Sequence, residues 1–211
     1  RRKEHYRLLS DIRKGEYEGL PEKLQDPNWQ PDYGKAIFNP KLGATVTGAR
    51  PFLIAYNINL DTTDIEISKK ISEEIRESGK ILRDENGKPI KDQNGVTKRI
   101  PGKLKAVQAM GVFLDKYNIT QVSTNLKNFE ITPLHTVFEE VKKLAQSFNV
   151  DVKGSEIVGL VPLKAVLMTA DFYAKGANLS EQEKVQLVIE KLGLNSLTDF
   201  IPKNKIIDYM I

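Results

Sequence analysis

Six apolar segments between Phe52 and Val161 alternate between strand-like and helix-like spacing, and this order limits the possible folds more than any other feature of the sequence. The expected strands are 52–60, 104–114, 120–129 and 156–161, and the expected helices lie within 61–78 and 132–148. The order β-α-β-β-α-β is typical of a ferredoxin-like domain, in which two helices cover one face of a four-stranded antiparallel sheet. We therefore expect an α/β fold of the α+β type, whose second sheet face must be buried against something else.

Helix-capping residues support this interpretation. Thr132 is expected to cap the second helix, with Pro133 in its first turn. Two extra helices are expected at 163–174 and 180–192, the latter starting with a capping box at Ser180. The chain should therefore end in a helical segment beyond the sheet.

The first fifty residues follow a different pattern. Apolar residues at helical spacing predict a helix over 4–14, and Pro and Gly interrupt every possible element within 19–50. This long segment carries Trp29, Tyr33, Ile37 and Phe38, which favour an ordered, packed loop over a disordered linker. We therefore divide the chain into residues 1–50 and 51–211. Because the chain opens at Arg1 inside a helical pattern, we expect that a part upstream has been removed.

A polar segment between residues 80 and 102 contains two tight-turn signals, Asn86-Gly87 and Asn94-Gly95. It predicts a hairpin that projects from the domain. Basic residues outnumber acidic ones here, so the segment suits either contact with an anion or simple solvation as an insertion.

Composition excludes several classes of function. The absence of Cys excludes disulfide scaffolds, Cys-ligated metals and thiolate catalysis, and agrees with a reducing compartment. The formal net charge of +4 is spread along the chain without any nucleic-acid-binding motif. No apolar run approaches the ~20 residues that a membrane span requires. We expect a cytoplasmic protein without a membrane or nucleic-acid partner.

His5 and His135 are the only histidines, and no metal-binding spacing surrounds either of them. His135 is expected near the start of a helix, with Glu139 one turn further on. Together they could act as a general base. A histidine that only hydrogen-bonds backbone groups at a helix start is the alternative.

Polar side chains are expected to share one face of the sheet. They are Asn57, Asn59, Gln108, Gln121, Ser123 and Asn125. Such a face suits a ligand with amides, carboxylates and a pterin-like edge. An ordinary half-solvated sheet face fits equally well.

Several long motifs resemble those of the formiminotransferase family, in the same order and over nearly the whole chain. They lie at 13–20, 29–34, 43–50, 52–60, 121–126 and 159–165. The resemblance implies glutamate formimidoyltransferase activity, which transfers the formimino group of N-formimino-L-glutamate to the co-substrate tetrahydrofolate in histidine degradation. It also implies two similar α/β lobes whose sheets face each other across a folate-binding tunnel.

By this resemblance, residues 1–50 are the tail of the first lobe and the seam between lobes, and 51–211 are the C-terminal lobe. The family's catalytic histidine lies in a His-Gly-Glu-His stretch of the first lobe, which neither His5 nor His135 matches. The resemblance therefore implies no catalytic residue in this chain, an inactive fragment, and the missing first lobe as a partner, with a homo-oligomer also possible. The alternative is a non-catalytic folate-binding or protein-interaction module.

The family's folate segment maps onto ten consecutive residues of this chain. They are Gly34, Lys35, Ala36, Ile37, Phe38, Asn39, Pro40, Lys41, Leu42 and Gly43. The glycines let backbone approach a planar ligand, Phe38 can pack on it, and Lys35 or Lys41 can meet its carboxylates. A packed connector without ligand contact is the alternative.

Overall fold

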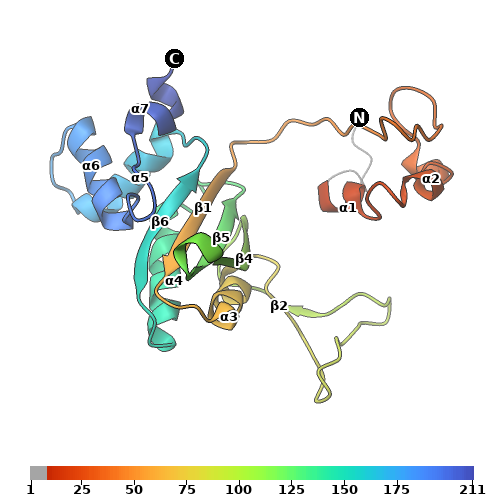
Figure 1. The fold of residues 1–211 in the computed structure, drawn as a ribbon, viewed down its shortest axis with the longest axis horizontal. Coiled ribbons are helices and arrows are strands. Elements are labelled where there is room, and N and C mark those ends of the chain that lie inside the picture. Colours follow the sequence, from red (N-terminus) through yellow and green to blue (C-terminus); the bar gives the residue numbers. More distant parts are fainter. Residues whose placement is uncertain (1–8) are drawn as a thin grey trace. The chain divides into compact units, whose positions relative to one another are not determined.

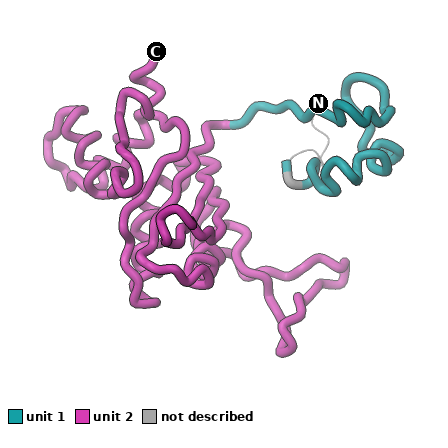
Figure 2. The backbone as a smooth tube through the Cα atoms, viewed as in Figure 1, with its two compact units in different colours: residues 1–50 teal, residues 51–211 magenta. Residues whose placement is uncertain are grey.

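The computed structural model describes residues 9–211. The chain divides into two compact units, whose boundary lies between Arg50 and Pro51 (Figure 2). The first unit contains the short helices α1 (Leu9–Arg13) and α2 (Leu20–Lys23) and a 3₁₀ turn, η2 (Pro27–Trp29). Helix α1 is the later part of the helix expected over 4–14, whose first residues lie outside the described part of the chain. The other described residues of this unit have no regular secondary structure.

The long segment of the first unit is less packed than its aromatic residues predict. Tyr33 is 93% exposed and Ile37 is 72% exposed, so the expectation of a packed loop is wrong for these two residues. Phe38 contacts the ring of Tyr17, and the Lys23 ammonium lies 3.9 Å from the Trp29 ring centroid. No described side chain in this unit is fully buried, because so short a piece of chain without strands cannot enclose a core.

The second unit is built on a four-stranded antiparallel sheet in the order β4-β5-β1-β6 (Figure 1). Its strands are β1 (Ile54–Leu60), β4 (Val107–Leu114), β5 (Ile119–Leu126) and β6 (Val152–Val158). Helix α3 (Ile65–Ile75) follows β1, the 3₁₀ turn η3 (Asp115–Tyr117) joins β4 to β5, and α4 (Leu134–Ser147) follows β5. A mixed α/β unit with an antiparallel sheet packed on helices is therefore confirmed.

The core lies between the sheet and its helices, because apolar side chains occupy alternate positions of the strands and so share one face. Ile54, Tyr56, Ile58 and Leu60 of β1 belong to one buried apolar cluster together with residues of α3 and α4. The residues between them on β1 point to the opposite face of the sheet, because successive side chains in a strand alternate. That opposite face carries the polar side chains.

Several strand boundaries and one cap differ from the expectation; β1 starts at Ile54 and β5 ends at Leu126. Strand β4 starts at Val107 because Ala106, at φ 55°, breaks the extended backbone before it. Strand β6 starts earlier than expected and ends at Val158, before Gly159 turns the chain at φ 80°. Thr132 does not cap α4: the N-cap residue is Pro133, and the Thr132 hydroxyl donates to the carbonyl of Lys105 at 2.6 Å.

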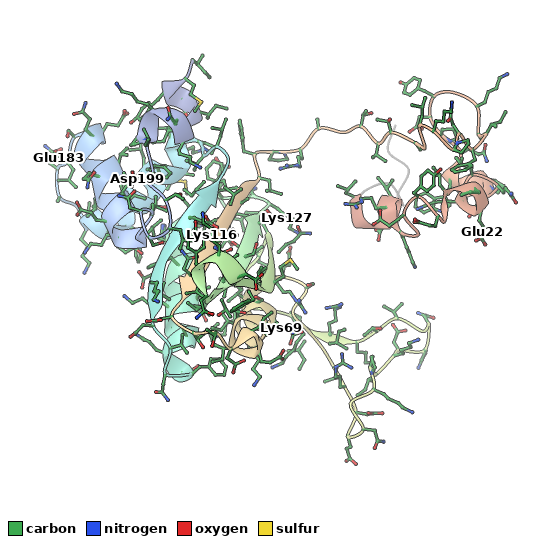
Figure 3. The ribbon with its side chains drawn as sticks, in the orientation of Figure 1. Glu22, Lys69, Lys116, Lys127, Glu183 and Asp199 are labelled. Carbon is green, nitrogen blue, oxygen red and sulfur yellow. The ribbon has the colours of Figure 1, made fainter. Side chains whose placement is uncertain are left out.

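The C-terminal segment closes the β6 edge of the sheet. It contains α5 (Leu163–Ala174), α6 (Glu181–Leu192), α7 (Pro202–Lys205) and the turn η4 (Ile207–Tyr209). Helix α6 begins with the expected capping box between Ser180 and Glu183. Glu183 is labelled in Figure 3. The Ser155 amide donates to the Gly193 carbonyl at 3.0 Å, where an added Cβ on Gly154 would lie 2.5 Å from the same oxygen. Glycine is therefore required for this close approach.

The segment at 80–102 is a forked arm rather than one hairpin (Figure 1). Its stem is the two-stranded pair β2 (Lys80–Ile81) and β3 (Arg99–Ile100). Three backbone hydrogen bonds close a ring at the fork: Leu82 donates to Lys98, Lys98 to Ile90, and Ile90 to Leu82, at 2.8–2.9 Å. Both expected turns are present at the tips of the two branches, where the side chains of Asp84 and Asp92 accept backbone amides.

No helix in the described part of the chain is long and apolar enough to cross a membrane.

Candidate functional site

The polar face of the sheet carries a connected set of amide side chains around one carboxylate. Strand register places Asn57 beside Ser123 on β5 and Glu156 on β6, and it places Asn59 beside Gln121. Gln108 on β4 lies opposite Asn125. The expectation that the six polar residues share one face is confirmed by this register.

The hydrogen bonds run in a chain that ends on Glu156. Gln121 Nε2 donates to Asn59 Oδ1 at 2.7 Å and to Glu156 Oε1 at 2.8 Å. Asn57 Nδ2 donates to the same Glu156 oxygen at 3.2 Å. At the other end, Asn59 Nδ2 donates to Ser196 Oγ at 2.9 Å. The network thus joins three strands to the loop after α6.

Burial varies across this face. Asn59 is fully buried and Gln121 is 2% exposed, whereas Ser123, Asn125 and Glu156 are half-buried and Gln108 is exposed. The face therefore presents hydrogen-bonding groups of two kinds: buried amides held by their neighbours, and side chains that remain partly exposed to solvent. Such an arrangement can bind a planar polar ligand through directed hydrogen bonds.

Sequence reasoning missed Glu156 and Ser196 as members of this network. Glu156 was placed at the start of an expected strand, and its alternation with Val158 could have assigned it to the polar face. Ser196 lies in a loop 137 residues from Asn59, so no local pattern could have found it.

The expected folate segment, residues 34–43, forms a separate open hollow within the first unit. About 410 Å³ of space is lined by Lys35, Ile37, Phe38, Asn39, Pro40 and Lys41. The Asn39 side chain accepts the backbone amides of Lys41 and Leu42 at 2.9 and 3.1 Å. The Tyr17 hydroxyl donates to the Pro40 carbonyl at 2.7 Å. These contacts give the segment a defined turn, as a binding loop requires.

A glycine stands at each end of this segment, and its two lysines line the hollow. Gly34 and Gly43 have φ angles of 85° and 63°, so both occupy backbone conformations that favour glycine. Lys35 and Lys41 form no ion pair with any described residue. Their ammonium groups can therefore meet the carboxylates of a ligand.

His135 is not arranged as a general base. Its ring stacks on Phe172 with 4.3 Å between centroids, and its Nδ1 is buried without a hydrogen-bond partner among the described residues. Glu139 instead accepts a hydrogen bond from the Tyr173 hydroxyl at 2.6 Å. Burial lowers the pKa of His135, and the Glu139 charge offsets this in part. No group of three potential metal ligands lies within the described residues.

Comparison with known proteins decides the family. The formiminotransferase domain model matches residues 55–211, and the model of that domain's N-terminal subdomain matches residues 1–50. This chain belongs to the formiminotransferase domain family. The expected family resemblance is thereby confirmed.

Relatives of this formiminotransferase chain include formimidoyltransferase-cyclodeaminases and glutamate formimidoyltransferases. It is 50% identical over 206 residues to the formimidoyltransferase-cyclodeaminase of Dictyostelium discoideum, covering 96% of this chain and 35% of that protein. It is 48% identical over 213 residues to the Gallus gallus protein of the same description, covering 100% and 36%. It is 41% identical over 165 residues to the glutamate formimidoyltransferase of Streptococcus pyogenes serotype M1, covering 78% and 48%. The chain thus spans between a third and a half of these relatives' length.

Proposed function

We propose that this chain is part of a glutamate formimidoyltransferase, which transfers the formimino group from N-formimino-L-glutamate to tetrahydrofolate in histidine degradation. The match of residues 55–211 to the family is the observation that carries this proposal. The names of two relatives support it, because both are described as glutamate formimidoyltransferases.

The proposed reaction exchanges one C–N bond for another. A folate ring nitrogen attacks the formimino carbon, and the bond from that carbon to the glutamate nitrogen breaks. The glutamate nitrogen leaves with a proton, so a positioned acid/base is needed, and such groups typically contribute 10²–10⁴-fold. We assign no such group to the present chain, and in our proposal it comes from a first lobe.

Each unit has a part in this proposal. Residues 51–211 are proposed to form a ferredoxin-like lobe, which the strand order β4-β5-β1-β6 supports. Its polar sheet face would line a ligand tunnel. Residues 1–50 are proposed to be the tail of the first lobe and the seam, with 34–43 contacting the folate. Within that segment, Lys35 or Lys41 would meet the folate carboxylates, and Phe38 would pack on its rings.

Reconstitution tests this function. The chain alone should transfer no formimino group to tetrahydrofolate, and adding a separately made first lobe should restore turnover. In the reconstituted enzyme, Lys41→Ala should raise the KM for folate by roughly 10- to 150-fold, as the loss of a charge-assisted hydrogen bond predicts.

The matched control is Lys88→Ala in the forked arm, which should leave the KM unchanged. Full activity of the chain without a first lobe would contradict the proposal. A larger effect of Lys88→Ala than of Lys41→Ala would move the anion site to the arm. The alternative, a non-catalytic folate-binding module, would bind folate both alone and after addition of a first lobe, without any turnover.

A further inference from the structure

Glu156 lies on the open face of the sheet, and only one of its two carboxylate oxygens is hydrogen-bonded to other side chains. Oε1 accepts from Gln121 at 2.8 Å and from Asn57 at 3.2 Å. Within the described part of the chain, Oε2 receives no hydrogen bond and the carboxylate has no ion-pair partner. Oε2 is not among the buried atoms that lack a partner, so it faces solvent and remains available to a ligand.

The donors that hold Glu156 cannot turn away to compensate Oε2. Gln121 is 2% exposed, and both hydrogens of its amide are used, one on Asn59 and one on Glu156. Asn57 is 9% exposed, and its carbonyl oxygen accepts from the backbone amide of Thr124 at 3.3 Å. Both amides are thus fixed, and they in turn fix the direction of Oε2.

A ligand nitrogen that donates a hydrogen bond is the natural complement of such an oxygen. Charge-assisted N–H···O⁻ bonds are shorter and about twice as strong as neutral ones. Planar N–C–N groups present N–H donors in a fixed plane, so they suit a carboxylate whose orientation is also fixed. A carbonyl or carboxylate of the ligand would instead be repelled at this position.

We propose that Glu156 Oε2 binds an N–H donor of a planar N–C–N group on the ligand. The inference rests on the proposed function, because both proposed substrates carry such a group: formiminoglutamate has a formamidine, and folate has an aminopyrimidinone edge. Glu156 is then a substrate-contacting residue that distinguishes these ligands from analogues with oxygen in place of the nitrogen.

The direct experiment uses acetamidinium, a small planar N–C–N cation, as the probe. The side-chain amide resonances of Gln121 and Asn57 in the full chain are followed by NMR during titration. Acetamidinium should shift them saturably, whereas tetramethylammonium, which has the same charge but no N–H, should not. Equal shifts with both cations would overturn the proposal.

Three glutamate variants make the test specific. Glu156→Gln removes the charge and should weaken the acetamidinium response by roughly 10- to 150-fold. The control Glu139→Gln changes another half-buried glutamate that accepts one side-chain hydrogen bond, from Tyr173. It should leave the response unchanged. If Glu156→Gln fails to fold, Glu156→Asp serves instead. It keeps the charge on a side chain one methylene shorter, which moves the carboxylate away from the ligand and should weaken the response. An undiminished response in either Glu156 variant would overturn the proposal.

Substrate analogues then identify which ligand Glu156 contacts in the reconstituted enzyme. Wild type should prefer N-formimino-L-glutamate to N-formyl-L-glutamate, or folate to its 2-oxo analogue, and Glu156→Gln should abolish one of these preferences. Retention of both preferences would overturn the proposal. A chain that responds to acetamidinium while the reconstituted enzyme shows no transfer would retain the Glu156 site and refute the proposed function instead.

Discussion

At the scale of single residues, His135 has the most unusual surroundings. Its ring is stacked on Phe172 where α4 and α5 meet, and burial lowers the pKa of its imidazole. Glu139 is the charged group that acts on it, and the Glu139 carboxylate also accepts a hydrogen bond from the Tyr173 hydroxyl. Protonation of His135 would therefore place a charge and an unpaired N–H in a partly apolar contact.

The sign of the resulting pH dependence follows from linkage. The neutral form is favoured in the folded state, so the unfolded chain binds more protons once the pH falls below the ordinary histidine pKa of about 6.5. The contribution of His135 to the free energy of unfolding should be constant above that pH. It should fall as the pH decreases toward the lowered pKa of the folded state. Denaturant unfolding at a series of pH values measures this.

His135→Phe should remove this part of the pH dependence, because phenylalanine can stack on Phe172 without titrating. His5→Gln, which changes the only other histidine, serves as the control. A wild-type-like acid dependence in His135→Phe would show that other groups are responsible.

The members of the polar face divide into residues that a sequence can place and residues that it cannot. Alternation along a strand was enough to group Asn57, Asn59 and Gln121. The direction of the Glu156 carboxylate depends on donors from two other strands, so it could not be read from the sequence. Thr132 was misjudged for the same reason, because a distant carbonyl competes with the helix start for its hydroxyl.

At the scale of elements, the packing of α3 on β4 depends on one glycine. An added Cβ on Gly111 would lie 2.5 Å from the Lys69 backbone nitrogen and 2.8 Å from the Ser68 carbonyl carbon. These atoms belong to the helix backbone and cannot move aside as a flexible side chain would. The α3 backbone can therefore approach this strand closely only where the side chain is missing.

We expect Gly111→Ala to lower the free energy of unfolding by about 1–3 kcal/mol or more, because it overpacks a rigid contact. Chemical denaturation measures the change. Gln108→Ala, on the same strand but at an exposed position, should alter stability by less than about 0.5 kcal/mol. Equal stability of the two variants would mean that α3 can shift without cost.

The elements themselves were largely predictable, and their ends were not. Periodicity identified α3, α4, α5 and α6, because each buries an apolar stripe. The start of β6 was missed because Lys153 and Gly154 do not look like strand residues. Gly154 is there because the backbone at Gly193 packs against it, which is a tertiary requirement.

At the scale of the whole molecule, the two units differ in their capacity to fold alone. Residues 51–211 contain the entire buried apolar cluster, whereas no described side chain of residues 9–50 is fully buried. We expect residues 51–211 alone to unfold cooperatively, with a Tm within a few degrees of that of the whole chain. Calorimetry on both proteins checks this, and loss of the cooperative transition on removing 1–50 would contradict it.

Ion pairs across the second unit also join parts distant in sequence, although they add little to its stability. Lys127, just after β5 and labelled in Figure 3, pairs with Glu77 beyond α3 at 2.9 Å, and both side chains are partly exposed. The pair lowers the pKa of Glu77, chiefly through its hydrogen bond to Lys127. Exposed pairs of this kind typically contribute less than 1 kcal/mol. We therefore attribute the expected ability of residues 51–211 to fold alone mainly to the apolar cluster.

The fork in the arm makes its length modular. Arg83 lies opposite Pro89, Ile81 opposite Arg99, and Lys80 opposite Ile100. If residues 90–97 were absent, Pro89 would be followed directly by Lys98, which would lie opposite Leu82 and continue the same pairing into one plain hairpin. The second branch is thus an eight-residue cassette that leaves the strand register unchanged on insertion or removal. A change that shifted the stem pairing by one residue would instead turn every later stem side chain to the other face.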